Sequence, residues 1–451
     1  MAEEFDIVCL GAGPAGEALA AELAGSGISL AVVEKNLVGG ECAYWGCMPS
    51  KTLLRAAETI AEAGRTIALS TSTISYVVDY PKVHARTFEV ARKLDDSGAK
   101  AAIESSGASV LRGAARLTGP RTVVVGDVTL VARKAVVVAT GSSAAMPPID
   151  GIKDVDAWTN HEAVLAEQLP ESLLVVGGGA VGAELCQAFV RLGSKVHLVE
   201  SGDHVVALEE PEVGRYLQSR LVAEGVHVVC SARAQKVERI EGGVRLSLAT
   251  GEQIDAERIL FATGRRPNTE GINFDAAGLT RDQRGWIKTD PQTLLAGDGI
   301  YAAGDITGLG GFTHLSHYHG TWIGKMLKGE DVKVSHAAIP RVTFTDPEVA
   351  AVGMIEARAR EAGINISVAT EDLANSARSY IHGEPGGFVK VIADRDRDVI
   401  IGASICSPRA GEMINEFVLA IRAEVPLAVM RDVVHPFPSF SRILQGVIAR
   451  L

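Results

Sequence analysis

The chain has few cysteines and no long apolar run. Only six of its 451 residues are cysteine, which excludes a small secreted fold that depends on disulfide bonds. No apolar stretch reaches the roughly 20 residues that a membrane-spanning helix needs. The first residues, MAEEFDIVCL, lack the basic and apolar regions of a signal peptide. These absences predict a cytoplasmic protein that neither spans nor binds a membrane.

Positive charge is also scarce. The sequence has 44 Lys and Arg against 55 Asp and Glu, a net charge of -11. A nucleic-acid partner is therefore not expected, because a phosphate backbone requires a basic surface. Hydrophobic residues make up 47% and charged residues 22%, as in ordinary globular proteins. The length predicts about two to four domains.

A glycine motif near the N-terminus predicts a dinucleotide site. The segment 5–35 has the pattern of a strand, a glycine turn, a helix and a second strand. A first glycine allows the tight turn, a second lets the backbone approach a pyrophosphate, and a third lets helix and strand pack closely. Glu34 ends the second strand, where its carboxylate can bind ribose hydroxyls. The expected loop residues are Gly11, Gly13, Pro14, Ala15 and Gly16.

The same pattern of strand, glycine turn, helix and strand recurs once. Because two complete copies are present, a glycine turn that binds no ligand is an improbable interpretation. The acidic residue of the second copy is Glu200, whose charge would repel a 2′-phosphate, so the second site is predicted to prefer NADH to NADPH. Two different dinucleotides are expected, since flavins and nicotinamides both use this fold. The expected loop residues are Gly177, Gly179, Val181 and Gly182.

Two further apolar strands end in similar glycine turns, VVVATGSS at 136–143 and ILFATGRRPN at 259–268. Such strands and turns suit the points where the chain passes from one domain to another. A short strand in GIYAAGDITG then ends near Asp305, which could hold a sugar-alcohol chain. The turn residues predicted to lie at the cofactor sites are Thr140, Gly141 and Gly264.

These motifs together resemble the flavoprotein disulfide reductases, the group of lipoamide dehydrogenase, glutathione reductase and mercuric reductase. The resemblance covers essentially the whole chain, with GAGPAG, GGEC…GCMPSK, ATGS, GGGAVGAEL, ATGRRPN, AAGD and FTDPEVAAVG in the family's order. It implies an α/β fold with two Rossmann-like domains, for FAD and NAD, and a C-terminal α+β dimerisation domain. The implied bounds are 1–147 and 267–333 for the FAD-binding domain, 148–266 for the NAD-binding domain, and 334–451 for the interface domain of a homodimer.

Cys42 and Cys47 could bind a metal, form a structural disulfide or pass electrons. A zinc site needs about four ligands, and no second cysteine pair exists. The cluster of His314, His317 and His319 is better explained by packing and exposed imidazoles, so no metal is expected. A structural disulfide does not suit a cytoplasmic chain. The expected helix from Pro49 places Cys47 at a helix N-terminus, which lowers a thiol pKa and favours a redox pair.

The resemblance implies a role for each residue around this pair. Cys47 would face the flavin, and Cys42 would exchange electrons with a small-molecule disulfide or a related acceptor. Lys51 would lie near the flavin and pair with Glu184 of the NAD-binding domain. Electrons would pass from NADH through FAD to the Cys42–Cys47 disulfide. Ala115 is a further predicted cofactor contact.

The C-terminal segment VVHPFPSFSRIL departs from the family's His-Pro-Thr-x-Ser-Glu pattern. The preferred alignment puts Phe437 at the histidine and Arg442 at the glutamate; the alternative puts His435 at the histidine and Phe440 at the glutamate. Either alignment loses the His–Glu pair that serves as acid and base. Losing such a group typically costs about 10²–10⁴ in rate, so efficient dihydrolipoamide oxidation is not expected unless His435 substitutes.

Aromatic residues form a second departure. Tyr44 and Trp45 lie between the cysteines, where they could fill space or, with Phe437 and Phe440, form an apolar wall for a hydrophobic acceptor. No cysteine follows Cys406, so mercury reduction is not supported. The alternatives left open are a dihydrolipoyl dehydrogenase, an NADH-dependent reductase of quinones or other acceptors, and a redox-sensing binding protein.

Overall fold

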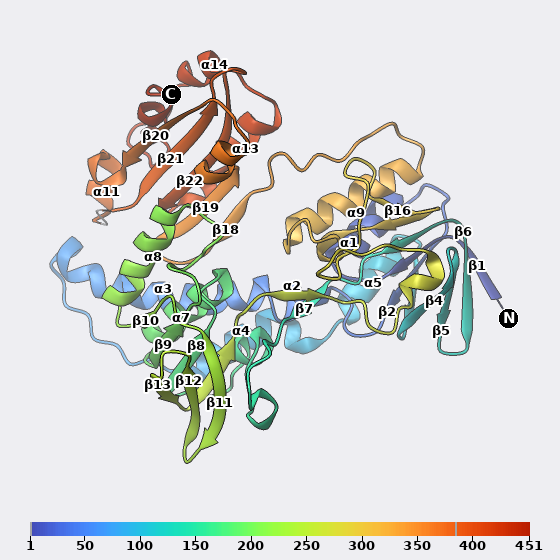
Figure 1. The fold of residues 1–451 in the computed structure, drawn as a ribbon, viewed down its shortest axis with the longest axis horizontal. Helices are drawn as coiled ribbons and strands as arrows, with labels where there is room; N and C mark the ends of the chain where they lie inside the picture. The colour runs from blue at the N-terminus through green and yellow to red at the C-terminus, as the bar shows by residue number, and fades with distance from the viewer. Residues whose placement is uncertain (1, 384–385) are drawn as a thin grey trace. The chain divides into compact units, whose positions relative to one another are not determined.

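The computed structural model describes residues 2–383 and 386–451 and has a mixed α/β architecture (Figure 1). The chain divides into two compact units. Unit 1 comprises residues 1–50, 86–145 and 264–336. Unit 2 comprises residues 51–85, 146–263 and 337–451. Helices α3 (Cys47–Ser70) and α4 (Tyr80–Val90) each cross a boundary between the two.

Unit 1 is built around a mostly parallel sheet with strand order β16-β17-β6-β1-β2-β3. Its central pairings place Ile7 opposite Leu30 and Val8 opposite Val136. The buried parts of the central strands are runs of apolar residues, IVCL at 7–10, LAVV at 30–33 and AVVV at 135–138, as expected for parallel strands covered on both faces. The strands are β1 (Ala2–Leu10), β2 (Leu30–Glu34), β3 (Ser109–Arg112), β4 (Ala115–Gly119), β5 (Thr122–Val125), β6 (Val128–Val138), β7 (Ser142–Ala144), β15 (Arg265–Pro267), β16 (Leu295–Gly297) and β17 (Ile300–Ala302).

Helices α1 (Pro14–Leu23) and α9 (Thr313–Leu327) pack closely against each other in unit 1. A Cβ at Gly320 of α9 would lie 2.2 Å from the Ala15 carbonyl oxygen, so only glycine permits this approach. The two helices share a buried core with Ile7 and Val32 of the sheet. The remaining helices of this unit are α2 (Gly40–Tyr44) and α5 (Ser97–Ser105).

Unit 2 contains a second parallel sheet, with order β10-β9-β8-β14, and a small antiparallel sheet, β11-β12-β13. Helix α7 (Ala180–Leu192) starts directly after the glycine turn and buries Leu185 and Phe189 against this parallel sheet. The other elements are α6 (Asn160–Val164), α8 (Pro211–Ala223), β8 (Ser172–Val176), β9 (Lys195–Val199), β10 (His227–Val229), β11 (Ala234–Ile240), β12 (Gly243–Leu248), β13 (Gln253–Ala256) and β14 (Arg258–Phe261).

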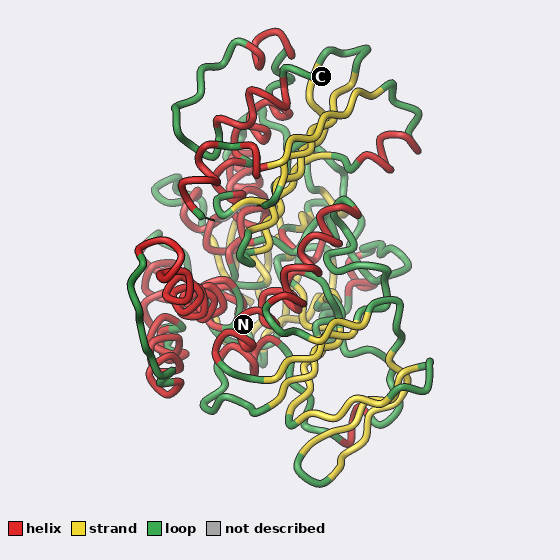
Figure 2. Tube along the Cα trace, turned by 90° about the vertical axis from the view of Figure 1, so that its left-hand side faces the viewer, coloured by secondary structure: helices red, strands yellow, loops and turns green. Residues whose placement is uncertain are grey.

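The C-terminal part of unit 2 is a five-stranded antiparallel sheet with order β18-β19-β22-β21-β20. Figure 2 shows strands lying side by side next to the C-terminus. Helices cover this sheet with Phe417, Leu444 and Val447 in the core. The elements are β18 (Arg341–Thr343), β19 (Glu348–Gly353), β20 (Ile366–Asp372), β21 (Phe388–Asp394), β22 (Val399–Ser407), α10 (Glu356–Glu361), α11 (Ala377–His382), α12 (Ala410–Met413), α13 (Asn415–Arg422), α14 (Leu427–Arg431) and α15 (Arg442–Ile448).

A buried ion-pair cluster lies within unit 2. The Lys390 side chain on β21 is 5% exposed, and its Nζ lies 3.0 Å from Glu210, 3.2 Å from Glu212 and 2.8 Å from Glu356. Glu210 and Glu212 stand at the start of α8 and Glu356 at the start of α10. One lysine therefore ties the segment that carries the second glycine motif to the C-terminal sheet.

Two local details differ from the sequence-based expectations. Helix α3 begins at Cys47, two residues before the expected start at Pro49. Residues 411–425, GEMINEFVLAIRAEV, have the pattern of one helix, but the structure divides this segment into α12 and α13. Among the described residues, no helix combines the length and apolarity needed to cross a membrane.

Candidate active site

Steric contacts within the protein explain two of the three glycines in the first motif, but not the middle one. A Cβ on Gly11, whose φ is +115°, would lie 2.2 Å from the Ala139 oxygen. A Cβ on Gly16 would lie 2.3 Å from the Gly11 oxygen. Around Gly13, within the described chain, the nearest atom to such a Cβ is Gly40 Cα at 3.8 Å. The space before Gly13 is therefore open, as a bound pyrophosphate requires.

The second motif repeats this arrangement in unit 2. A Cβ on Gly177, at φ +107°, would lie 2.4 Å from the Ala262 oxygen, and one on Gly182 would lie 1.9 Å from the Gly177 oxygen. A Cβ on Gly179 would meet no described atom within 4 Å. Both loops thus fit a dinucleotide, because the middle glycine in each leaves the backbone open to close approach by a pyrophosphate.

The two predicted acids are held against their glycine loops. Glu34 accepts hydrogen bonds from the backbone nitrogens of Ala12 at 2.9 Å and Asn36 at 2.7 Å. Glu200 accepts them from Gly178 and Gly202, both at 2.6 Å. A carboxylate has about four lone-pair positions, so each can still accept ribose hydroxyls.

Asp305 lies in a polar network in unit 1. Ser142 Oγ donates to Asp305 Oδ2 at 2.6 Å, and Arg265 Nε donates to Ser142 Oγ at 2.6 Å. The Arg265 guanidinium also lies 3.7 Å from Asp305 and 3.6 Å from Glu41. Since Glu41 precedes Cys42 in α2, the network connects the predicted cofactor residue Asp305 to the helix that carries one of the two cysteines.

The crossing strands are joined by backbone and side-chain hydrogen bonds. Thr140 Oγ1 donates to the Asn268 oxygen at 2.9 Å, and Asn268 N donates to the Gly141 oxygen at 3.0 Å. The Gly264 oxygen accepts from Ala145 N at 2.9 Å. These three predicted residues therefore hold the crossing point itself.

The two cysteines of the central motif are in contact. Cys42 lies in α2, Cys47 is the first residue of α3, and both are half-buried. The Cys42 thiol is hydrogen-bonded to Cys47. Cys47 Sγ also lies 3.2 Å from Thr313 Oγ1, the first side chain of α9. The N-termini of two long helices therefore meet at this sulfur, where their partial positive charge favours a thiolate.

Cys42 holds its proton more firmly than an ordinary thiol. Its hydrogen bond to Cys47, together with burial, raises the pKa of the Cys42 thiol far above its ordinary value. Cys42 can therefore remain protonated and donate to a Cys47 thiolate. The Thr313 hydroxyl is placed to donate a second hydrogen bond to the same sulfur.

Lys51 and Glu184 form an ion pair in unit 2, which is the pairing that the sequence predicts. Lys51 Nζ lies 2.7 Å from Glu184 Oε2, and the Glu184 side chain is only 5% exposed. Glu184 Oε1 also accepts a hydrogen bond from Phe344 N at 2.8 Å. The ammonium group lies 4.9 Å from the centroid of the Phe344 ring. Lys51 is therefore held at a fixed position one helical turn after Cys47.

His435 of the C-terminal segment forms a histidine–carboxylate pair with Glu416, which the sequence does not reveal. His435 Nε2 lies 3.0 and 3.1 Å from the two carboxylate oxygens of Glu416, on α13. The side chain of His435 is 3% exposed, and its buried Nδ1 has no partner among the described residues. Phe437, in contrast, is 73% exposed. His435 is thus fixed inside unit 2, whereas Phe437 faces outward.

The prediction of an apolar wall is wrong for Tyr44 and Phe440, two of its four aromatic residues. Tyr44 is completely buried, and its hydroxyl donates to the Val38 oxygen at 2.7 Å. Phe440 is 7% exposed and packs edge-on against His382 at 5.4 Å. Both rings fill space in the core, which is the other interpretation of these aromatics.

The histidine cluster is divided between surface and core. His319 is completely buried, accepts from Gly304 N at 3.1 Å and lies 2.9 Å from His336 Nε2. Burial, together with the neighbouring His336, lowers the pKa of His319 to about 3, so the ring is neutral. Among the residues that the structure describes, no three His, Cys, Asp or Glu side chains are placed to hold a metal ion.

The predicted residues fall into two groups. Unit 1 brings together the first loop, Glu34, both cysteines and Asp305, whereas unit 2 brings together the second loop, Glu200 and the Lys51–Glu184 pair. The remaining predicted residues lie at the starts of elements: Pro14 and Ala15 start α1, Ala115 starts β4, and Val181 lies in the first turn of α7.

Thr313 is the site residue that the sequence analysis missed. It belongs to FTHLSHYHG, where the histidines attract attention. The available signal was its position directly before a helical pattern that follows the AAGD strand. Its contact with Cys47 joins positions 266 residues apart, which no local pattern can indicate.

Comparison with known proteins agrees with this geometry. The family model described as "Pyridine nucleotide-disulphide oxidoreductase" matches residues 5–323, and that of its "dimerisation domain" matches residues 339–447. A dihydrolipoyl dehydrogenase of Chlamydia muridarum is 30% identical over 98% of this chain and 96% of its own. A mercuric reductase of Shigella flexneri is 35% identical over 96% of this chain and 78% of its own.

Two solved structures have the same fold. RclA of Escherichia coli, an HOCl-induced flavoprotein disulfide reductase, has a TM-score of 0.87 and 27% identity, covering 99% of each chain. LpdA of Mycobacterium tuberculosis also has a TM-score of 0.87 and 27% identity, covering 98% of this chain and 99% of its own. The family uses FAD and NAD(P)H. The chain therefore belongs to the pyridine nucleotide-disulphide oxidoreductases, the flavoprotein disulfide reductase family of enzymes.

Proposed function

We propose that this enzyme takes electrons from NADH and passes them through FAD and the Cys42–Cys47 pair to a small disulfide or related acceptor. The observation that carries the proposal is the contact between these two cysteines and Thr313 at the start of two helices. Residues 1–147 and 267–333 would bind FAD, residues 148–266 would bind the nicotinamide, and residues 334–451 would form the subunit interface.

The first loop fits FAD, because its middle glycine leaves room for a pyrophosphate and Glu34 offers lone pairs to a ribose. Asp305 would hold the sugar-alcohol chain, oriented by Ser142 and Arg265. When bound, the flavin supplies transfer of an electron pair from the nicotinamide to the disulfide. Lys51, fixed by Glu184, would place a positive charge beside the flavin ring.

The two cysteines would have different tasks. Cys47 would face the flavin as the thiolate, stabilised by the helix ends, the Thr313 hydroxyl and the Cys42 thiol. Cys42 would exchange with the acceptor. Because only a thiolate attacks a disulfide, Cys42 would pass its proton in that step to the Cys47 thiolate, with which it is hydrogen-bonded. Lipoamide, the acceptor that the similarity to dihydrolipoyl dehydrogenases suggests, is the alternative candidate.

Substituting the middle glycine of the first motif tests FAD binding at this loop. Gly13→Ala should fold normally, because its Cβ would enter open space, but should weaken FAD binding by at least about tenfold by blocking the pyrophosphate. Gly16→Ala should instead destabilise the protein, because its Cβ would meet the Gly11 oxygen at 2.3 Å. Flavin retention and thermal unfolding of both variants separate the two effects; normal FAD affinity in Gly13→Ala would contradict this assignment.

The preference for NADH is proposed from Glu200, which faces the second loop. The purified protein should oxidise NADH with a small aromatic disulfide and use NADPH at least about tenfold less well, because the carboxylate repels a 2′-phosphate. Glu200→Gln should reduce this preference by about tenfold. Glu252→Gln, which removes the same charge elsewhere in unit 2, is the control. Lipoamide should be a poor acceptor in the same assays. Equal use of both nucleotides by the wild type would refute the preference.

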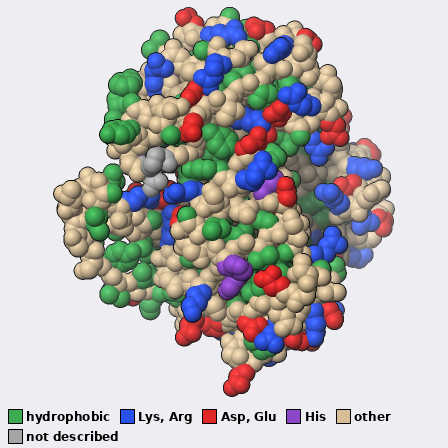
Figure 3. Space-filling view, turned by 60° about the vertical axis from the view of Figure 1, so that its left-hand side comes forward, with side chains coloured by type: hydrophobic (Ala, Val, Ile, Leu, Met, Phe, Trp, Pro, Cys, Tyr) green, Lys and Arg blue, Asp and Glu red, His purple; other side chains and the backbone are tan. Residues whose placement is uncertain are grey.

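We also propose a homodimer, since the chain carries the family's dimerisation domain. Unit 2 exposes large apolar side chains that a monomer would not need, and Figure 3 shows hydrophobic groups gathered on one face. The exposed large apolar side chains of the C-terminal sheet region and of the end of α3 are Ile67, Leu69, Tyr380, Ile381, Leu419, Val429, Val434 and Phe437.

We also propose that the protein is located in the cytoplasm, since cysteines without structural disulfides suit that compartment.

A further inference from the structure

The buried ring of His319, on α9, is joined through both of its nitrogens to other parts of unit 1. Its Nδ1 accepts a hydrogen bond from Gly304 N at 3.1 Å, and its Nε2 lies 2.9 Å from His336 Nε2. Gly304 begins the 3₁₀ turn η4 (Gly304–Thr307), which also contains Asp305. The ring therefore holds the turn that carries the residue assigned to the sugar-alcohol chain of FAD.

Only one placement of protons satisfies this series of hydrogen bonds. A backbone N–H can only donate, so His319 Nδ1 must be the nitrogen without a proton. The proton of the neutral ring then lies on Nε2, which donates to His336 Nε2. His336 must carry its own proton on Nδ1, which fits its hydrogen bond to the backbone of Pro291, since proline can only accept. Each ring nitrogen thus has a fixed role.

The backbone of Gly304 depends on His319 for its partner. The residue is buried, its φ is +73°, and a Cβ there would lie 2.7 Å from Ser316 Oγ. Its carbonyl oxygen accepts a hydrogen bond from the Thr307 hydroxyl at 2.8 Å. Loss of the imidazole acceptor would leave a buried N–H group unsatisfied, which strongly disfavours this conformation of the turn.

The two rings have no carboxylate partner. In the described part of the chain, neither ring forms an ion pair or hydrogen bond with an acidic side chain. Burial, together with His336, lowers the pKa of His319 to about 3, and burial also lowers the pKa of His336. The titratable and charged side chains on the elements around the pair are Glu17 and Glu22 of α1, Asp305 of η4, Tyr318 of α9, and Asp290 and Lys333 of the adjoining segments.

We propose that His319 and His336 are positioning residues for FAD, because the two neutral rings hold the η4 turn, and with it Asp305, in the conformation that binds the sugar-alcohol chain. The proposal rests on the proposed function, which assigns Asp305 to FAD. A proton added to His336 Nε2 would remove the acceptor of the His319 Nε2–H group. If His319 instead accepted from His336 through Nε2, its own proton would lie on Nδ1, and the bond to Gly304 would be lost.

This arrangement predicts the direction of the pH dependence. The pKa of each histidine is lowered in the intact turn, so the released turn binds protons more readily. The hold on the turn is therefore complete at neutral and higher pH and is lost as the pH falls.

The test measures the dissociation constant of FAD by diluting the FAD-loaded enzyme at about pH 7.5 and at about pH 5 and recording the fluorescence of released flavin. The wild-type constant should rise at least about tenfold at the lower pH. His336→Gln should match the wild type at neutral pH, because the amide oxygen can accept from His319, but should change less than about threefold on acidification. His319→Leu, which has no acceptor, should bind FAD about tenfold more weakly already at neutral pH.

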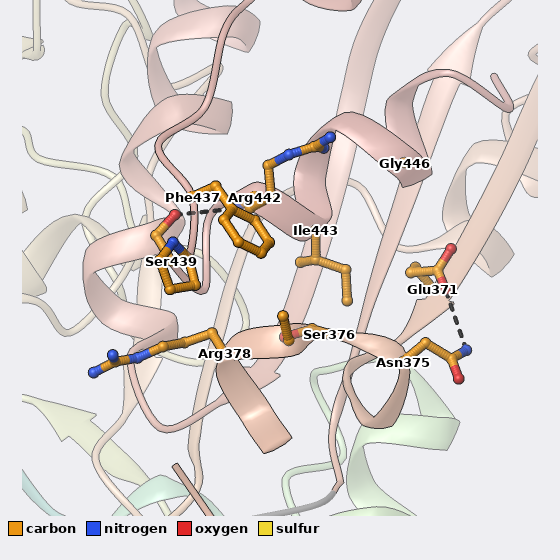
Figure 4. A pocket seen from close by; sticks show the side chains of 11 residues that line it. Glu371, Asn375, Ser376, Arg378, Phe437, Ser439, Arg442, Ile443 and Gly446 are labelled. Carbon is orange, nitrogen blue, oxygen red and sulfur yellow. Dashed lines mark hydrogen bonds between the residues drawn. The ribbon is translucent and has the colours of Figure 1, made fainter. Parts of the chain in front are cut away.

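Two variants in unit 2 serve as controls. His227→Gln removes one ring of a second histidine pair, in which its Nδ1 lies 3.1 Å from that of His197. Arg378→Gln removes one positive charge beside a pocket of about 290 Å³, where Figure 4 shows this arginine. Both should keep the wild-type pH dependence. A wild-type constant that does not change with pH, or a His336→Gln variant as sensitive to acid as the wild type, would overturn the proposal.

Failure of the proposed function gives a different result. With FAD in excess at neutral pH, NADH should reduce the Cys42–Cys47 pair equally well in His336→Gln and in the wild type, since His336 has no part in the electron pathway. If electrons fail to reach the cysteines in both proteins while only the wild type loses FAD in acid, the electron pathway falls and the positioning role stands.

Discussion

Cys47→Ser should lower NADH-driven disulfide reduction by at least about 10³-fold, because the sulfur that connects the flavin to Cys42 is removed. Serine keeps the position and hydrogen-bonding capacity of the side chain but cannot form the disulfide. Reduction of ferricyanide by NADH, which bypasses the thiols, should change by less than about threefold. Steady-state assays with an aromatic disulfide and with ferricyanide give the two rates.

Cys230→Ser is the control for this change. Cys230 is also half-buried and free, but its sulfur contacts Gln218 in unit 2 rather than a second cysteine. Both rates should remain at the wild-type level in this variant. Substantial disulfide reduction by Cys47→Ser would show that electrons leave the flavin by another route, as in a direct quinone reductase.

Lys390→Met should destabilise unit 2 by about 3–5 kcal/mol, because it leaves buried carboxylates without their counter-charge. Glu210, whose side chain is 2% exposed, would suffer most. Methionine preserves the length and apolar volume of the lysine stem, so the loss measures charge rather than a cavity. Urea unfolding of the FAD-loaded variant, followed by hydrogen exchange in β21 and α8, reports the effect.

A double variant tests the cause. Adding Glu210→Gln to Lys390→Met should recover part of the lost stability, because the buried charge is then absent. Lys328→Met removes an exposed lysine that pairs with Glu22 in unit 1, and it should destabilise the protein much less, because exposed ion pairs contribute little. A loss in Lys390→Met no greater than in Lys328→Met would show that the cluster contributes nothing.

Local patterns were sufficient to predict the two glycine loops and their acids. In both motifs the spacing of the glycines matches a steric need within a few residues, since a Cβ on Gly16 or on Gly182 would meet the backbone oxygen of the first glycine of the same motif. The family resemblance supplied the Lys51–Glu184 pair, which joins residues 133 positions apart. The overall α/β class follows from these units, because alternating apolar strands and helices favour parallel sheets.

Contacts that depend on tertiary packing were not predictable. Thr313 and Glu416 reach Cys47 and His435 only through the arrangement of α9 and α13, and neither carries a motif of its own. Tyr44 was predicted as a candidate substrate contact because it lies between the cysteines, but the turn at Gly39 directs its ring into the core. Position in a sequence does not determine which way an aromatic side chain faces.

The central claim is that electrons from NADH reach the Cys42–Cys47 pair. An anaerobic titration of the purified yellow protein with NADH, followed by its visible spectrum, tests it most directly. The hydrogen-bonded Cys42–Cys47 pair, with Thr313 beside Cys47, predicts a long-wavelength thiolate-to-flavin charge-transfer band while the flavin remains oxidised. Bleaching of the flavin by NADH with no such band would contradict the account.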